Sequence, residues 1–192
     1  MNRFWVLDVE GNGAVPPEII ELAMVEVVDQ KLSGKSFHWL IKPKKPIRPS
    51  VTRIHGITDD DVASSPTIED VADDILTWIQ DIPIVGHNVR VEVSSLKLAL
   101  PDWKPTVAID TLKMARSFHP SLKSYGLQSL GEHFDLTEKA HEISGAHHHA
   151  ALYDAALAAL LLICLVEKLP ENELQRALLD ADYLNPKQGS LL

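Results

Sequence analysis

The chain has few of the features that mark secreted and membrane proteins. It contains one cysteine, Cys164, which excludes an internal disulfide and favours a reducing, cytoplasmic setting. Nothing near the N-terminus resembles a signal peptide, because the apolar stretch 4–7 is short and runs directly into acidic residues. The longest apolar run, 155–166, is shorter than a membrane span requires and indicates a buried helix. We therefore expect no membrane partner.

An excess of basic charge is also lacking. The chain has 18 Lys and Arg against 27 Asp and Glu, a formal net charge of −9. This balance argues against a protein that coats long nucleic acid, which usually needs a basic face. It does not exclude an enzyme that holds one strand end through metal ions. One basic patch can be a solvated loop or a rim that faces phosphates: Lys42, Lys44, Lys45, Arg48 and Arg53.

The first part of the chain has the pattern of a β-meander. With 192 residues, 45% hydrophobic and 23% charged, the composition fits one globular domain. A β-rich run begins at residue 3, a second covers 18–28 and a third covers 37–41, with Gly34 in the turn before the third. These runs predict three antiparallel strands. The proline-rich stretch 43–49 predicts a loop.

The remainder alternates helices with short strands. Short strands are predicted at 83–85 and 107–109, and Thr58 and Thr67 each have the pattern of a helix cap. Further helices are predicted over 91–100, 110–117, 127–134, 147–168 and 171–181, and the residues from Pro186 are predicted to fray. This order indicates a single α/β domain with a mixed sheet and helices on its faces.

Two acidic residues end the first strand. Asp8 and Glu10 follow an apolar run, and Gly11 and Gly13 come directly afterwards. Strand residues two apart point the same way, about 6.5 Å from each other. The pair therefore offers oxygen ligands to a hard divalent cation. A strand that runs out into an ordinary polar turn is the alternative interpretation.

Three histidines precede the most apolar helix. Residues five apart on a helix diverge by about 140°, so His149 and Asp154 converge only if His149 lies at the helix entrance. A histidine there can change protonation near neutral pH, as a general base must. The run His147–His149 is equally compatible with an exposed loop or an adventitious metal site.

Six short motifs resemble, in their order and spacing, those of the DEDDh 3′-to-5′ exonucleases. That group includes ribonuclease T, oligoribonuclease and the proofreading subunit of bacterial DNA polymerase III. The resemblance covers about residues 3–165 and implies a ribonuclease H-like fold, with a mixed five-stranded sheet and helices on both faces. It implies an exonuclease domain over 1–168, with a C-terminal helix and tail over 169–192 packed on it or trailing from it. The motifs are Asp8-Val-Glu10, Ile54-His-Gly-Ile-Thr58, Gly86-His87-Asn88, Ile109-Asp-Thr-Leu112, Tyr125-Gly-Leu-Gln-Ser-Leu130 and His149-x-Ala-x-x-Asp154.

The resemblance also implies an activity: hydrolysis of phosphodiester bonds at single-stranded 3′ ends of DNA or RNA, with release of nucleoside monophosphates. The acidic charge balance favours short oligomers as the substrate. Asp8, Glu10 and Asp154 match the family's first, second and last acidic metal ligands. His149 matches the general base that removes a proton from water. The implied cofactor is a pair of Mg²⁺ ions, which Mn²⁺ should replace, in a two-metal hydrolytic mechanism.

Three positions depart from the family pattern. Glu92 takes the place of the third acid, normally an aspartate, and Val91 replaces the usual aromatic before it. A displacement on the scale of the extra methylene can cost a catalytic site about 100-fold. Gly11 stands where many members have a hydroxyl-bearing residue. These departures leave a second interpretation open, in which the chain is a weakened exonuclease-fold module that binds nucleic acid or regulates.

Several further residues have predicted roles near the site. His87 is predicted to hold the strand-to-helix turn, and Asp110 to cap a helix rather than bind metal. His55 is interpreted either as a residue that fixes its loop or as a substrate contact. The residues expected to contact substrate are Gly11, Asn12, His55 and Asn88.

Overall fold

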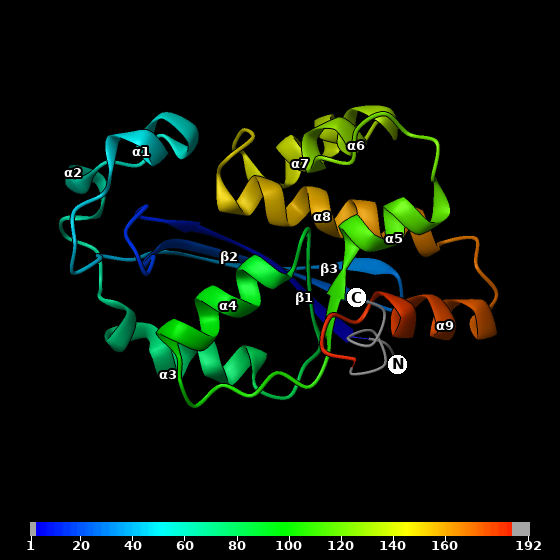
Figure 1. The fold of residues 1–192 in the computed structure, drawn as a ribbon, viewed down its shortest axis with the longest axis horizontal. Helices are drawn as coiled ribbons and strands as arrows, with labels where there is room; N and C mark the ends of the chain where they lie inside the picture. Colours follow the sequence, from blue (N-terminus) through cyan, green and yellow to red (C-terminus); the bar gives the residue numbers. More distant parts are fainter. Residues whose placement is uncertain (1–2, 186–192) are drawn as a thin grey trace.

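The computed structural model describes residues 3–185 and contains a five-stranded mixed sheet, as predicted. Strands β1 (Arg3–Gly11), β2 (Ile19–Val28) and β3 (Lys31–Leu40) pair antiparallel. Strands β4 (Ile84–Gly86) and β5 (Ala108–Asp110) extend the sheet in parallel from β1. The spatial order is β3-β2-β1-β4-β5, so β1 lies at the centre (Figure 1).

The hairpin between β2 and β3 turns at Asp29 and Gln30. Both residues have positive φ, 49° and 62°, as a two-residue type I′ turn requires. The prediction of a turn at Gly34 is wrong, because Gly34 lies inside β3 with a φ of 85°. The β2–β3 register shifts between Val25 and Val27, opposite this glycine. A glycine in a strand marks a bulge as readily as a turn.

Nine helices surround the sheet in the described part of the chain. Their bounds are α1 (Pro49–His55), α2 (Asp59–Val62), α3 (Ile68–Ile79), α4 (Arg90–Ala99), α5 (Thr111–Phe118), α6 (Leu127–His133), α7 (Thr137–Ser144), α8 (Ala151–Val166) and α9 (Glu171–Ala181). Thr58 and Thr67 head α2 and α3 in capping boxes, as predicted. The sequence pattern did not predict α1 and α7, which bury little: α7 buries Ala140. Within residues 3–185, none of the helices combines the length and apolarity of a membrane span.

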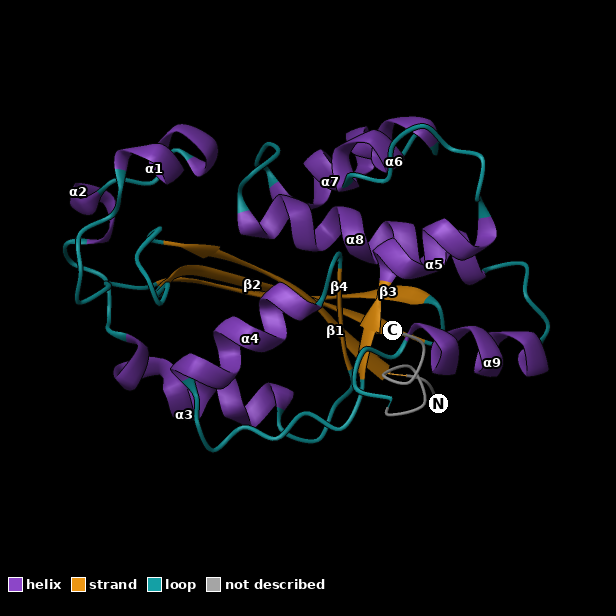
Figure 2. Ribbon diagram, in the orientation of Figure 1, coloured by secondary structure: helices purple, strands orange, loops and turns teal. Residues whose placement is uncertain are grey.

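The helices form a layer on each face of the sheet (Figure 2). One layer contains α5 to α8, and the central helix α8 packs across β1 and β2. Ala155 and Ala159 of α8 are fully buried, and their small side chains let the helix approach the sheet closely. The other layer contains α3 and α4, whose Ile75 and Leu96 pack with Trp5 of β1. The central strand is therefore covered on both faces.

The chain after α8 returns to the outer edge of β5. Helix α9 packs against α5 and β5. Asp182, 8% exposed, accepts hydrogen bonds from the N–H groups of Ala108 and Leu184, both at 3.0 Å. The N–H of Tyr183 donates to the carbonyl of Ala108 at 2.7 Å. These bonds occupy the free edge of β5. The frayed tail predicted from residue 186 lies outside the described residues.

We expect a methyl group at Gly131 to destabilise the contact between α6 and α8. An added Cβ would lie 2.8 and 2.9 Å from the two Cδ atoms of the fully buried Leu157. Gly131→Ala should therefore lower the free energy of unfolding by about 1–3 kcal/mol, measured by urea denaturation. The matched control is Gly126→Ala at the N-cap of the same helix, where an added Cβ meets no described atom closer than 3.9 Å. Equal effects of the two substitutions would contradict this packing.

Candidate active site

Three carboxylates from two elements converge beside β1. Asp8 and Glu10 project from one face of the strand, and Asp154 comes from the first turn of α8, which crosses that face. One oxygen from each of these side chains lies within 4.8 Å of the other two. The structure thus brings together three acids that are separated by up to 146 positions in the sequence.

Glu92 stands beside this group without belonging to the 4.8 Å set. It lies in the first turn of α4 and is 3% exposed. Its Oε2 atom has no hydrogen-bond partner within residues 3–185. The same atom lies 3.1 Å from where a Cβ of Gly86 would be, so the glycine leaves room for the longer acid. Buried polar atoms are seldom left without a partner, so this oxygen is available to a cation or a water molecule.

Burial and crowding raise the pKa values of these acids. Burial raises the pKa of Asp8 well above its ordinary value, and the charges of Glu92 and Asp154 add to the effect. Burial, followed by the charge of Asp154, raises the pKa of Glu10 to about 8. The pKa of Glu92 also rises to about 8, again chiefly through burial. At neutral pH the site therefore holds protons that a divalent cation would have to displace.

The histidine loop, residues 147–149, lies just before α8. His149 has a left-handed φ of 69°, and its N–H donates to Oδ2 of Asp154 at 3.2 Å. Because α8 begins at Ala151, His149 lies at the helix entrance, as convergence with Asp154 requires. Burial lowers the pKa of His149, and His148 acts in the same direction. Its imidazole is therefore neutral at neutral pH and able to accept a proton.

His148 makes the imidazole contact to Asp154 that the sequence does not predict. Its Nδ1 lies 3.0 Å from Oδ1 of Asp154. Its ring stacks on that of His149, with centroids 3.7 Å apart. Sequence spacing gave no basis for this pairing, because it depends on the left-handed backbone at residue 149.

Glu21 is a positioning residue that the sequence analysis missed. It lies on β2, pairs opposite Glu10 and is 5% exposed. Its Oε2 accepts the N–H of Ala151 at 2.9 Å, and its Oε1 lies 2.7 Å from Nε2 of His38. The first N–H groups of a helix have no partner within the helix, so Glu21 fixes the start of α8. An acid inside an otherwise apolar strand was the available signal, and Glu26 of the same strand shows the same pattern.

Asn12 has a structural role, which corrects the expectation that it contacts substrate. Its side chain is fully buried. Oδ1 accepts the N–H groups of Ala14 and Glu18, both at 3.0 Å, and Nδ2 donates to the carbonyl of Lys45 at 3.2 Å. These three bonds hold the loop after β1. A side chain without exposed surface cannot meet a nucleotide.

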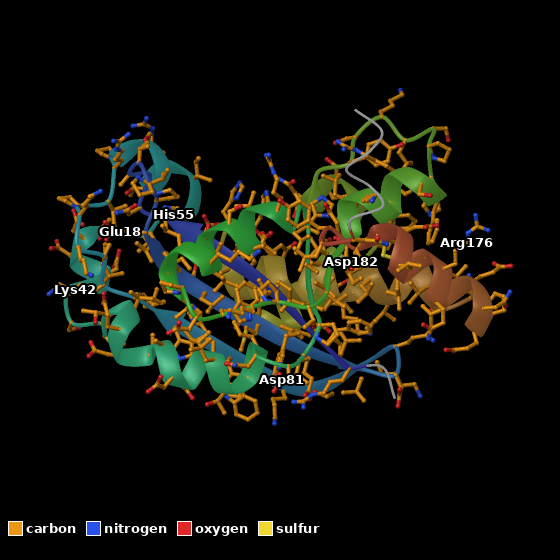
Figure 3. All side chains as sticks on the ribbon, turned by 60° about the horizontal axis from the view of Figure 1, so that its bottom comes forward. Glu18, Lys42, His55, Asp81, Arg176 and Asp182 are labelled. Carbon is orange, nitrogen blue, oxygen red and sulfur yellow. The ribbon has the colours of Figure 1, made fainter. Side chains whose placement is uncertain are left out.

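His55 ends α1 and faces the site. Its Nδ1 accepts the N–H of Ile57 at 3.1 Å, which fixes the local loop. Burial lowers the pKa of His55, the Gly11 backbone opposes this shift and His149 adds to it. The imidazole therefore lies near Gly11, which follows Glu10, and near His149 of the histidine loop. In Figure 3 it is found at the end of the molecule that also carries Lys42.

His87 holds the turn between β4 and α4, as predicted. Its Nε2 donates to the carbonyl of Tyr125 at 2.8 Å. Its Nδ1 lies 3.0 Å from Oγ1 of the buried Thr111. Both ring nitrogens are thus engaged with the protein, which joins the end of β4 to the start of α5 and to the segment before α6.

Asp110 caps α5, which confirms its predicted role. Its Oδ1 accepts the N–H of Leu112 at 2.9 Å and the N–H of Asn88 at 3.0 Å. Asn88 has a φ of 68°, a left-handed conformation that asparagine adopts more readily than most residues. The bond from Asp110 therefore holds Asn88 just before α4, the helix that carries Glu92.

Part of the predicted basic patch is engaged with the protein itself. Nζ of Lys42 donates to the carbonyl of Ala63 at 2.9 Å. Lys44 forms an ion pair with Glu69 of α3. These contacts tie the segment after β3 to α2 and α3, which supports the loop interpretation for the two lysines.

We expect the pH dependence of stability to report the raised acid pKa values in metal-free protein. A carboxyl with a folded pKa of about 8 keeps its proton when folded but loses it near its ordinary pKa when unfolded. Its contribution to the unfolding free energy therefore falls as pH rises from about 5 to 8. Glu92→Gln removes one such group, so the difference in Tm, variant minus wild type, should increase across this range.

The measurement is thermal unfolding in chelator at pH 5, 6, 7 and 8. A change of 1 kcal/mol corresponds to about 2–4 °C in a chain of this size. The comparison between variant and wild type cancels the opposite pH effect of the histidines, whose pKa values are lowered. A difference in Tm that does not change with pH would refute the raised pKa of Glu92.

Comparison with known proteins assigns the chain to a family. The exonuclease family RNase_T matches residues 5–162. The DNA polymerase III subunit epsilon of Rickettsia felis is 34% identical over 165 residues, which cover 80% of this chain and 69% of the relative. The PolC-type DNA polymerase III of Caldanaerobacter subterraneus is 32% identical over 174 residues, which cover 88% of this chain but 12% of that longer relative.

A solved structure agrees. Exonuclease X in complex with 5′ overhanging duplex DNA is 31% identical, with a TM-score of 0.72 over 92% of this chain and 99% of that chain. The family match over residues 5–162 includes Asp8, Glu10 and Asp154 of the acid cluster. This chain therefore belongs to the RNase_T exonuclease family, and its resemblance to the DEDDh group is confirmed.

Proposed function

We propose that the protein is a metal-dependent 3′-to-5′ exonuclease that hydrolyses phosphodiester bonds at single-stranded 3′ ends and releases nucleoside monophosphates. The observation that carries this proposal is the convergence of Asp8, Glu10 and Asp154 within 4.8 Å beside the histidine loop. Family membership supports the reaction class. Exonuclease X was solved with DNA and the two relatives are DNA polymerase III proteins, which supports DNA as the first substrate to test.

The residues present fit a pair of divalent cations. The three converging carboxylates and the unpaired Oε2 of Glu92 form an oxygen-only donor set, which Mg²⁺ prefers and Mn²⁺ accepts. In this proposal Asp8, Glu10, Glu92 and Asp154 hold the ions. When bound, the two cations stabilise charge on the attacking and leaving oxygens.

His149 is the proposed general base. Its imidazole is neutral near pH 7, because burial lowers its pKa, so it can take a proton from the attacking water. Asp154 lies beside it and stabilises the charged imidazolium that forms. Glu21 keeps the start of α8 fixed through Ala151, so that the base and Asp154 stay in register with β1.

Gly11, His55 and Asn88 are the proposed substrate contacts. Gly11 follows Glu10 directly, so its backbone N–H can meet the terminal nucleotide. An added Cβ there would meet only ordinary contacts, the nearest described atom being Cβ of Pro17 at 3.6 Å. A hydroxyl-bearing residue would therefore fit at position 11, and its absence removes a side-chain contact without a steric reason.

We expect His149→Ala to reduce the release of mononucleotides by about 100- to 10,000-fold, because the proton acceptor is lost. The assay uses a 3′-labelled single-stranded oligonucleotide with Mg²⁺ or Mn²⁺. His147→Ala is the matched control, because its ring packs against His141, with centroids 4.8 Å apart. The proposal fails if wild-type protein releases nothing from DNA or RNA with either metal.

A weakened binding module is the second candidate. The observation that favours it is the glutamate at position 92, where the family pattern has an aspartate.

Under the exonuclease proposal, we expect Glu92→Asp to lower activity by about 100-fold, because the shorter acid withdraws from the space beside Gly86. Glu142→Asp on the exposed side of α7 controls for the chemical change. A large gain from near-zero activity in Glu92→Asp would instead establish the weakened module. The readout is the rate of mononucleotide release at saturating metal.

A further inference from the structure

The histidine loop creates a second metal-ligand set beside the acid cluster. One ligand atom from each of His148, His149 and Asp154 lies within 4.8 Å of the other two. This set contains two imidazole nitrogens and one carboxylate, whereas the neighbouring set contains oxygens alone. The two sets share Asp154. Magnesium prefers oxygen ligands, and zinc and its neighbours bind imidazole well.

We propose that His148, His149 and Asp154 bind a transition-metal ion of the Zn²⁺ class, and that this ion inhibits the enzyme. Three protein ligands with one open position is an ordinary arrangement for zinc. The inhibition, unlike the binding, rests on the proposed exonuclease function. The proposed inhibitory ion uses a residue, His148, that the exonuclease motif does not include.

The geometry needs little rearrangement to close around an ion. Nδ1 of His148 is already 3.0 Å from Oδ1 of Asp154, and the two rings stack at 3.7 Å. The bond from the N–H of His149 to Oδ2 of Asp154 fixes the backbone between them. All three ligands lie within seven consecutive residues, 148–154, so rotation of side chains can bring them to bonding distance without moving the sheet.

An ion can reach this set from solvent. The side chain of His148 is 37% exposed. It lines an open hollow of about 430 Å³ together with Gln128, Thr137, Glu138, His141, His147 and Tyr153. Behind Asp154 lie Asp8 and Glu10, each with an oxygen within 4.8 Å of a carboxylate oxygen of Asp154.

The histidine beside the set has a different partner. His147 stacks on His141, whose Nδ1 donates to the carbonyl of Ala146 at 2.8 Å. It therefore lies in the same loop and hollow without joining the three ligand atoms. This makes His147 an internal control for a general effect of histidine content.

Occupancy would remove two groups from the reaction. A nitrogen of His149 that is bonded to an ion has no lone pair left to accept a proton from water. Asp154 cannot at the same time direct that oxygen to an ion held by Asp8 and Glu10. Zinc should therefore act against magnesium, and a chelator selective for zinc should restore activity.

The first test measures binding without substrate. The 192-residue chain is titrated with Co²⁺, followed by visible absorption, and the signal is then displaced with Zn²⁺. We expect one tight, strongly absorbing site per chain in wild type, affinity at that site lower by about tenfold or more in His148→Gln, and wild-type affinity in His147→Gln. Asp8→Asn should retain the cobalt signal, because Asp8 belongs to the oxygen-only set and not to the set that contains the histidines. Loss of affinity in His147→Gln or Asp8→Asn but not in His148→Gln would overturn the site.

The second test measures mononucleotide release in Mg²⁺ with increasing Zn²⁺, each variant being compared with its own zinc-free rate. We expect the inhibitory zinc concentration to rise about tenfold or more in His148→Gln and to stay unchanged in His147→Gln. Uninhibited wild-type enzyme at zinc concentrations that fill the site would overturn the inhibition. If no variant releases nucleotides, the proposed function fails, while the cobalt titration still decides whether the site exists.

Discussion

Electrostatic repulsion among the carboxylates beside β1 is the constraint that the rest of the structure must offset. Asp8, Glu10 and Asp154 are held within 4.8 Å, and burial removes much of the water that would screen them. No isolated peptide would keep this arrangement. The central strand and the buried helix α8 hold it through apolar packing on both faces of the sheet. Protons or cations then supply the neutralising charge, which makes the cluster a binding site.

Strands β2 and β3 contribute to the site although neither supplies a proposed ligand. Glu21 of β2 bonds both the start of α8 and His38 of β3. The position of Asp154 thus depends on a chain of contacts that begins at the outer strand. Glu21 therefore links the pairing of β2 with β3 to the position of the first turn of α8. Disruption of β3 would therefore affect chemistry that takes place on the other side of β2.

The parts predicted from sequence are those with local or periodic causes. The alternation of strand side chains placed Asp8 and Glu10 together, and capping boxes placed α2 and α3. The roles of Glu21 and His148 were missed because they depend on a partner 130 residues away in one case and on a left-handed backbone in the other. The burial of Asn12 was equally invisible, since three backbone groups from its loop and from residue 45 enclose it.

The segment over the edge of β5 has a consequence for self-association. An open strand edge offers unpaired backbone groups to any extended chain nearby. Here Asp182 and Tyr183 take up both the N–H and the carbonyl of Ala108. An intermolecular sheet could grow from this side only after that segment detached. Residues 182–183 thus protect this strand edge from pairing with another chain, and this protection does not depend on the active site.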